Sequence, residues 1–319
     1  MAHRFPFRFG VINERPLPRD EWLALVRRVE ELGYATFLIR DHLATDFFGA
    51  QYGPIAALAT AAAITSRLRV GTMVIANDFR HPAILAKEFA TLSVLSGGRV
   101  ELGIGAGWMR AEYDQTGITF DSAGQRIARL EESLAIIDAI WRGERLSFAG
   151  AHYRIEDLAG YPLVGAGCRP TLVVGGGRPR ALRLAGRVAD VVGVLTSAYG
   201  TGRMISPVSE RTQETVKLKI SWIQEGAGDR FEQVELSMIP TIVVTDDREA
   251  AASAAVLQYG WEGHAVADVL EMPSMLLGTI EEIIDGLVRR REEFGFSYIV
   301  VSDTQMEEFA PVVAALRGR

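Results

Sequence analysis

Short apolar runs alternate with longer amphipathic segments along the chain. The short runs, rich in Val and Ile, predict strands, and apolar residues repeating every three or four positions predict helices. Strands are predicted at residues 7–12, 35–42, 68–77, 99–107, 168–177, 190–195, 234–245 and 296–303. Helices are predicted at residues 22–32, 54–66, 81–97, 121–141, 179–189, 208–226, 278–295 and 307–316.

This strand-then-helix order repeats eight times within 319 residues. Such a repeat predicts an α/β fold of the (β/α)₈ barrel type, which takes about 250 residues plus insertions. Residues 143–167 and 258–277 are predicted to be insertions between units. No Pro-, Gly- or Ser-rich linker divides the chain, so residues 1–319 are expected to form one domain. A doubly wound sheet split between two domains is the alternative.

The stretch SGGRVELGIGAGWMRAEY, residues 96–113, carries Gly103, Gly105 and Gly107 at alternate positions. A dinucleotide-binding turn would have a helix beginning inside the glycines, but the next helical pattern starts only near Asp121. A phosphate loop of the G-x-x-x-x-G-K-[ST] type is absent as well. Both nucleotide-binding interpretations are therefore disfavoured, and the purpose of the glycines depends on the remaining chain.

Composition narrows the class of protein. The net charge is 34 − 40 = −6, which does not favour a nucleic-acid-binding surface. One cysteine, Cys168, excludes an internal disulfide framework. The first sixteen residues hold no long apolar run, and no uncharged stretch reaches the roughly 18 residues of a membrane span. We therefore expect a cytoplasmic globular protein with a small-molecule substrate and no nucleic-acid or membrane partner.

Polar residues and glycines follow several predicted strands, and the carboxyl ends of barrel strands meet at one face. Asp41 and His42 end the second strand, and Trp108 follows the glycines of the fourth. His42 suits proton transfer near neutral pH, although Asp41-His42 could equally be a loop cap. Backbone amides at 175–177, next to Arg178, would suit an anion such as a phosphate.

Two classes of chemistry are disfavoured by missing motifs. The five histidines are scattered and form neither H-E-x-x-H nor H-x-x-E-H, so no metal site is predicted. There is no G-x-S-x-G nucleophile elbow. Redox chemistry on a bound organic cofactor remains, for which the protein would chiefly bind, orient and shield the cofactor.

Three segments carry a family resemblance: DH at 41–42, RHPAILAKEFATLSVLSGGRVELGIGAGW at 80–108, and LAGRVADVV at 184–192. With them, the chain resembles the bacterial-luciferase-like flavin and deazaflavin oxidoreductases over essentially its whole length. It looks most like the actinobacterial branch that uses coenzyme F420, a 5-deazaflavin. The resemblance implies the (β/α)₈ barrel that the element count also predicts.

The resemblance and the strand ends together indicate a set of site residues. His42 would lie beside the cofactor ring and transfer the proton. A non-proline cis peptide is expected between Met73 and Val74. The expected cofactor-binding residues are Asp41, Met73, Val74, Asn77, Gly105, Ala106, Gly107, Gly175, Gly176, Gly177, Arg178 and Thr196. The expected substrate pocket is formed by Trp108, Phe47 and Phe48.

One position departs from the resemblance. The F420-dependent sugar-phosphate dehydrogenase that this region resembles has an acidic glutamate where this chain has Trp108. A sugar phosphate is therefore a doubtful substrate, and Trp108 would form an apolar wall for a less polar molecule. The second acid or base of that enzyme has no counterpart that the sequence reveals.

Three functional hypotheses follow from the resemblance. The first is an F420-dependent oxidoreductase that transfers a hydride between the deazaflavin C5 and a fairly apolar organic substrate. The second is an FMN-dependent monooxygenase that uses O₂ and reduced flavin from a partner flavin reductase. The third is a non-catalytic flavin-binding protein. A homodimer is expected.

Overall fold

The computed structural model describes residues 5–45, 47–165, 167–197 and 202–319 of the chain. It contains a closed barrel of eight parallel strands in the order β3-β2-β1-β13-β10-β9-β8-β5, and pairing of β3 with β5 closes the ring. The barrel strands are β1 (Arg8–Asn13), β2 (Thr36–Ile39), β3 (Arg69–Thr72), β5 (Val100–Gly105), β8 (Thr171–Gly176), β9 (Val191–Val194), β10 (Glu235–Met238) and β13 (Phe296–Ser302). The predicted (β/α)₈ barrel is confirmed.

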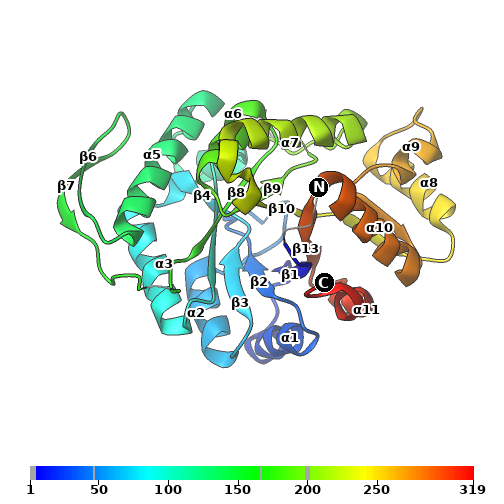
Figure 1. Cartoon of the computed structure of the whole chain (residues 1–319), viewed down its shortest axis with the longest axis horizontal. Coiled ribbons are helices and arrows are strands. Elements are labelled where there is room, and N and C mark those ends of the chain that lie inside the picture. The colour runs from blue at the N-terminus through cyan, green and yellow to red at the C-terminus, as the bar shows by residue number, and fades with distance from the viewer. Residues whose placement is uncertain (1–4, 46, 166, 198–201) are drawn as a thin grey trace.

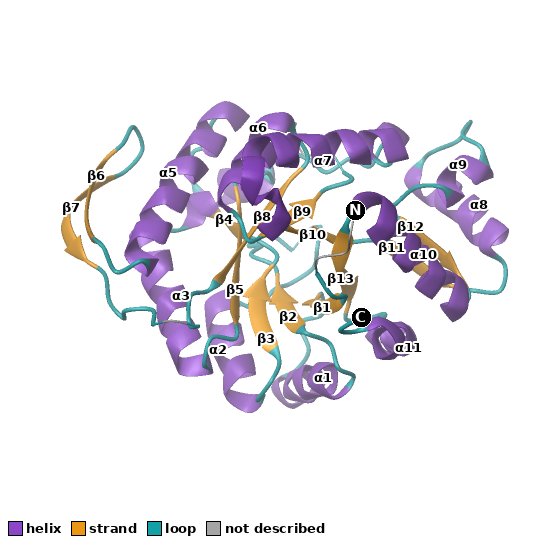
Figure 2. Cartoon of the chain, viewed as in Figure 1, coloured by secondary structure: helices purple, strands orange, loops and turns teal. Residues whose placement is uncertain are grey.

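Helices follow the barrel strands and lie outside them (Figures 1 and 2). They cover one side of each strand while the barrel interior covers the other, so the strands are apolar almost throughout. In β2, for example, all four residues are buried. The surrounding helices are α1 (Arg19–Glu31), α2 (Pro54–Ile64), α3 (Pro82–Ser96), α5 (Ala123–Trp141), α6 (Pro179–Val188), α7 (Gln213–Ala227), α10 (Ile280–Phe294) and α11 (Met306–Leu316).

The predicted seventh strand, 234–245, is divided in the structure. The barrel strand β10 ends at Met238, and β11 (Thr241–Val244) pairs with β12 (Met275–Gly278) in a separate two-stranded sheet. Pro240 lies at the break and has no N–H to give to a ladder. Apolar residues on both sides of Pro240 hid the division, because hydrophobicity alone does not say which sheet a residue joins.

Several elements were not predicted. Helices α8 (Arg248–Tyr259) and α9 (Val266–Leu270) lie between β11 and β12, and α8 is rich in alanine, which blurs the apolar repeat. The insertion at 143–167 contains a hairpin of β6 (Arg145–Ala149) and β7 (Arg154–Ala159). The short strand β4 (Ile75–Ala76) and the 3₁₀ turn η1 (Asn77–Phe79) interrupt the region between β3 and α3.

Two shorter elements border the strand ends that concern function. Helix α4 (Arg110–Thr116) begins just after the glycine-rich strand, where the sequence predicted no helix before Asp121. The predicted helix at 208–226 divides into the 3₁₀ turn η2 (Val208–Glu210) and α7, whose first turn is capped by Thr212. A third 3₁₀ segment, η3 (Gly228–Gln233), follows α7.

The amino-terminal end of the barrel is filled by an ion-pair network. Glu101 is fully buried there, 2.8 Å from the Arg69 guanidinium and also paired with Arg8. The hydroxyl of Tyr298 donates to the other Glu101 oxygen at 3.1 Å. Burial alone would raise the pKa of Glu101, but the charges of Arg8 and Arg69 lower it. Buried, mutually paired side chains therefore occupy this end of the barrel, whereas barrel enzymes carry their active sites at the opposite end.

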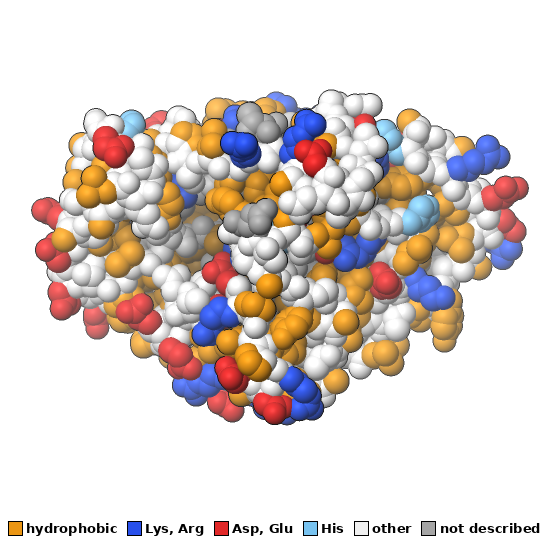
Figure 3. Space-filling view, turned by 180° about the vertical axis from the view of Figure 1, so that it is seen from behind, with side chains coloured by type: hydrophobic (Ala, Val, Ile, Leu, Met, Phe, Trp, Pro, Cys, Tyr) orange, Lys and Arg blue, Asp and Glu red, His pale blue; other side chains and the backbone are white. Residues whose placement is uncertain are grey.

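The outer surface carries charges of both signs. Figure 3 shows Lys and Arg side chains interspersed with Asp and Glu on the face it draws, without one large basic patch. Among the described residues, no helix is both long and apolar enough to cross a bilayer.

Candidate active site

A cavity of about 510 Å³ lies at the carboxyl ends of the barrel strands. Barrel enzymes place their active sites at this face. Among the residues expected from the sequence, the cavity is lined by Asp41, His42, Phe48, Met73, Val74, Gly105, Ala106, Gly107, Trp108, Gly175, Gly177, Arg178 and Thr196. The fold therefore brings together residues that end or follow five different strands, β2, β3, β5, β8 and β9.

Three expected site residues do not line this cavity. Asn77 is 1% exposed, and its amide nitrogen lies 3.4 Å from the Tyr153 hydroxyl. Gly176 faces α6, since a Cβ there would lie 3.1 Å from the Cβ of Ala181. Phe47 is half-exposed at the rim and packs on Phe48 and Trp108.

Two of the alternating glycines, Gly103 within β5 and Gly107 just after it, serve the packing of the protein itself. A Cβ at Gly103 would lie 1.9 Å from the carbonyl oxygen of Thr72. At Gly107, whose φ is +72°, a Cβ would lie 1.9 Å from the Tyr113 hydroxyl. Both positions therefore exclude any side chain, and only Gly105 and Gly107 border the cavity. The expectation that these glycines make room for a ligand therefore applies only to Gly105 and Gly107.

A second glycine pair does leave open space. Gly175 on β8 and Gly193 on β9 are direct neighbours in the sheet, and both line the cavity. A Cβ at Gly175 would meet nothing closer than 3.9 Å, and one at Gly193 nothing closer than 3.6 Å. The two glycines form a side-chain-free backbone floor that a flat ring or an extended chain can approach. Gly193 was not among the residues expected from the sequence.

The peptide bond between Met73 and Val74 is cis, which confirms the expectation from the family resemblance. Both residues lie between β3 and β4 and line the cavity. The Thr72 hydroxyl donates to the Gly103 carbonyl at 2.8 Å and accepts from the Gly103 N–H at 3.0 Å. These bonds tie this segment to the neighbouring strand β5.

His42 is paired with a buried carboxylate. Its Nδ1 lies 3.1 Å and 3.2 Å from the two oxygens of Glu112 on α4. The backbone N–H groups of Leu43 and Ala44 donate to the same carboxylate at 2.6 Å and 3.1 Å. A carboxylate accepting from Nδ1 places the ring proton there, so Nε2 is the nitrogen left to accept a proton.

Glu112 is ionised in this setting. Burial alone would raise its pKa, but the hydrogen bond from His42, the charge that His42 carries when protonated, and the bonds from two backbone N–H groups outweigh burial and lower it. The sequence analysis missed this residue because the seven-residue α4 is too short to show a helical repeat. The nearest sequence signal is an acidic residue four positions after Trp108.

Aromatic rings surround the histidine. The His42 ring centroid lies 4.6 Å from Phe48 and 5.8 Å from Trp108, and Phe47 lies 6.0 Å from Trp108. Arg40 covers the Phe48 ring at 4.5 Å. One wall of the cavity, beside the only histidine that lines it among the described residues, is therefore apolar.

Asp41 has its oxygens occupied by protein groups. Arg80 donates to both of them, one at 2.9 Å, and the Ala76 N–H donates at 3.1 Å. The carboxylate is 4% exposed. This arrangement ties the end of β2 to the segment between β4 and α3, so Asp41 supports the loops at the cavity edge.

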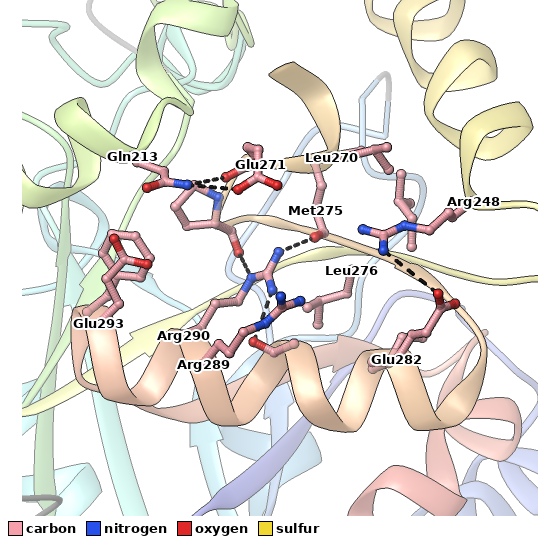
Figure 4. A pocket seen from close by; sticks show the side chains of 15 residues that line it. Gln213, Arg248, Leu270, Glu271, Met275, Leu276, Glu282, Arg289, Arg290 and Glu293 are labelled. Atoms are coloured by element: carbon pink, nitrogen blue, oxygen red, sulfur yellow. Dashed lines mark hydrogen bonds and ion pairs between the residues drawn. The ribbon is translucent and has the colours of Figure 1, made fainter. Parts of the chain in front are cut away.

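A smaller cavity of about 330 Å³ lies outside the barrel, between α10 and the segment 270–277 (Figure 4). Its central cation, Arg290, donates to the carbonyls of Pro273 at 2.7 Å and Met275 at 2.7 Å. Burial, together with the charge of Arg289, lowers the pKa of Arg290 to about 10. Arg290 thus fastens β12 to α10, and this cavity shows no catalytic pairing.

Among the described residues, no cluster of His, Cys, Asp and Glu could hold a metal ion.

Known proteins resemble the chain in sequence and structure. The profile of a family described as luciferase-like monooxygenase matches residues 2–276. An F420-dependent glucose-6-phosphate dehydrogenase of Intrasporangium calvum is 36% identical over 293 residues, 86% of this chain and 79% of that protein. The same-named protein of Microbacterium testaceum is 34% identical over 193 residues, 58% of this chain; the chain spans about half of that relative, 55%.

A solved structure agrees over the full length. That of an F420-dependent secondary alcohol dehydrogenase in complex with an F420–acetone adduct has a TM-score of 0.76 and 20% identity. The alignment covers 98% of this chain and 100% of that one. At this identity the likeness establishes the fold.

Proposed function

The chain belongs to the luciferase-like monooxygenase family, and on that premise we propose that it is an F420-dependent oxidoreductase acting on a small, fairly apolar organic substrate. Relatives named F420-dependent dehydrogenases support the cofactor. The observation that carries the proposal is the His42–Glu112 pair at the cavity, which supplies a proton-transfer group beside an apolar wall.

The residues present fit the cofactor. The open floor at Gly175 and Gly193 accepts a flat ring or its side chain without a clash. Gly177, Arg178 and the amino-terminal end of α6 provide N–H groups and positive charge for a phosphate. When bound, F420 supplies a ring carbon that accepts or donates a hydride. His42 would accept the matching proton of an alcohol at Nε2, or return it to a carbonyl.

The substrate class is supported by the wall around His42. Trp108, Phe48 and Phe47 offer rings rather than charges. Two of the cations that line the cavity are engaged by protein groups: Arg40 pairs with Glu14, and Arg126 donates to the carbonyls of Gly107 and Asp121. A substrate that carries a phosphate dianion would find no free cation next to His42 among these groups.

One experiment decides between the proposal and its alternatives. Titration with F420 and with FMN, followed by fluorescence quenching, shows which cofactor binds more tightly. Turnover of alcohols or ketones without O₂ excludes the FMN-dependent monooxygenase, which would also need a flavin reductase partner. F420 binding without turnover across a broad substrate panel would favour the non-catalytic flavin-binding protein.

Arg178→Ala is expected to weaken F420 binding about 5- to 10-fold without unfolding the protein, because a charged hydrogen bond to phosphate is lost at a partly solvated position. Fluorescence titration measures the change. Arg180→Ala is the matched control, since Arg180 lies on the same helix and bonds the Gly124 carbonyl. Unchanged affinity in Arg178→Ala would place the phosphate elsewhere.

We also propose a homodimer formed through the outer faces of α2 and α3. Helix α2 contains no charged residue, and its exposed positions include Ala56, Ala59 and Ala63. On α3, Ile84 and Leu95 are 59% and 81% exposed. This face is mainly apolar, with Lys87 and Glu88 of α3 as its charged residues. A self-complementary, mainly apolar face suits a second copy of the same chain around a two-fold axis.

Ala59→Arg is expected to convert the dimer to a monomer, because it places a charge in the middle of that face. Light scattering after size exclusion measures the mass. Leu257→Arg, at a 71% exposed position on α8, is the control and should leave the mass unchanged. A dimer that persists in Ala59→Arg would contradict the proposed interface.

A further inference from the structure

A buried ion pair lies behind the strand ends where the cofactor phosphate is proposed to bind. Lys219 on α7 is 1% exposed. Its ammonium donates to a Glu210 carboxylate oxygen at 2.7 Å, to the Glu210 carbonyl at 3.2 Å and to the Leu195 carbonyl at 2.7 Å. The three N–H groups are thus all occupied, and α7, η2 and the end of β9 are joined at one point.

The same carboxylate reaches the cavity. The second oxygen of Glu210 lies 2.9 Å from Nη2 of Arg178, and Arg178 both lines the cavity and precedes α6. Leu195, whose carbonyl Lys219 holds, also lines the cavity next to Thr196. The Lys219–Glu210 pair therefore holds both Arg178 and the Leu195 backbone, which line the same cavity.

The stability of the fold does not by itself explain why a buried ion pair is present here. Removing two charges from water costs about as much as their attraction returns, so apolar side chains of the same size often serve equally well. Burial lowers the pKa of Lys219 against the opposing effect of Glu210, which shows the cost of desolvation. An apolar pair could not hold the guanidinium of Arg178 in one place. The Arg178 side chain is long and 64% exposed, so fixing its conformation requires a partner.

We infer that Glu210 and Lys219 are positioning residues for the phosphate-bearing part of the cofactor: Lys219 orients Glu210, and Glu210 holds Arg178 at the cavity. This inference rests on the proposed function. The three charges sum to +1, which suits a singly charged phosphodiester. Neutralising Glu210 does not remove the cation, so the expected loss comes from orientation of Arg178 rather than from its charge.

The test compares two ligands that differ at the phosphate. One is F420, and the other is the deazaflavin that ends at the ribityl hydroxyl and lacks the phosphate and all groups beyond it. Glu210→Gln should weaken F420 binding about 5-fold, measured by fluorescence quenching, and leave the affinity for the phosphate-free ligand unchanged. Equal losses for both ligands would show a merely structural role and overturn the inference.

A double-mutant cycle provides the second criterion. If Glu210 acts through Arg178, Glu210→Gln should have no further effect on F420 affinity in the Arg178→Ala background. Additive losses would overturn the inference while leaving the proposed function intact. A parent protein that binds neither deazaflavin would overturn the proposed function, and the inference with it.

Matched variants on α7 control for folding. Glu225→Gln and Lys217→Met alter exposed ion pairs with Arg183 and Glu293 and should leave both affinities unchanged. Lys219→Met should repeat the selective loss of F420 affinity, with folding checked by circular dichroism. Should Glu210→Gln not fold, Glu210→Asp keeps a charge near Lys219 but shortens the reach toward Arg178. It should then show the same loss confined to F420, and retention of full F420 affinity would overturn the inference.

Discussion

His42→Ala is expected to retain F420 and to lose at least about 10²-fold in kcat, whatever substrate proves to be used. Hydride transfer to a carbonyl, or from an alcohol, needs a matched proton transfer, and removal of a general acid or base costs about 10²–10⁴-fold. His42 lies at the end of β2, lines the cavity and keeps Nε2 available because Glu112 holds Nδ1.

Steady-state kinetics and F420 titration measure the two effects separately. His42→Phe should behave like His42→Ala, which separates loss of the proton-transfer group from loss of ring volume. His152→Ala is the control, since His152 lies in the turn of the β6–β7 hairpin, away from the cavity. A His42 variant that binds F420 and turns over at the parental rate would assign proton transfer to another residue or to water.

Glu112→Gln is expected to lower kcat by about 10²-fold or more with little change in shape, because an amide imposes a different ring tautomer. The Gln oxygen would still accept from the N–H groups of Leu43 and Ala44, so its NH₂ would face Nδ1 of His42. Nδ1 would then accept a hydrogen bond, the ring proton would move to Nε2, and Nε2 could no longer act as a base.

The matched control is Glu132→Gln. Glu132 also accepts from backbone N–H groups, those of Ala151, His152 and Tyr153, but lies outside the cavity. Its substitution should leave kcat unchanged. Parental kcat in Glu112→Gln, with F420 affinity preserved, would refute the role assigned to the carboxylate.

The Glu112 carboxylate should also contribute a pH-dependent part of stability. Its pKa is lower in the folded protein than the usual value near 4.3, so the folded state favours the charged form. That contribution is full above about pH 5 and is lost as the pH falls through the folded pKa. The difference in unfolding free energy between the parent and Glu112→Gln should therefore be largest at neutral pH and shrink below about pH 4.

Much of the barrel could be predicted because its evidence is local. Runs of buried apolar residues mark strands such as β8, with Leu172, Val173 and Val174, and β9, with Val191 and Val192. Helices α5 and α10 carry capping boxes at Ser122 and Thr279 next to clear apolar repeats. Prediction failed where those signals are weak, at the alanine-rich α8, the short α4 and the break at Pro240.

The candidate site likewise has features that the sequence predicts and features that it does not. The placement of His42, Trp108 and Arg178 at one face follows from the parallel order of the strands, which puts all their carboxyl ends together. The hydrogen-bond partners of these residues do not follow from the order of the strands. His42 and Glu112 are 70 residues apart, and nothing in either segment encodes that α4 will turn the carboxylate toward Nδ1.

The glycines show why free space in the site could not be predicted from the sequence. The alternating run at Gly103, Gly105 and Gly107 indicated a backbone without side chains, but the structure alone shows that Thr72 and Tyr113 occupy much of that space. It also shows that the open floor lies at Gly175 and Gly193. Hydrophobic periodicity depends on neighbours along the chain, so the barrel strands, most of the surrounding helices, their order and the face that carries the site could be predicted before any contact was known. Hydrogen-bond partners and free volume depend on atoms that folding brings together from distant segments, so these could be read only from the folded chain.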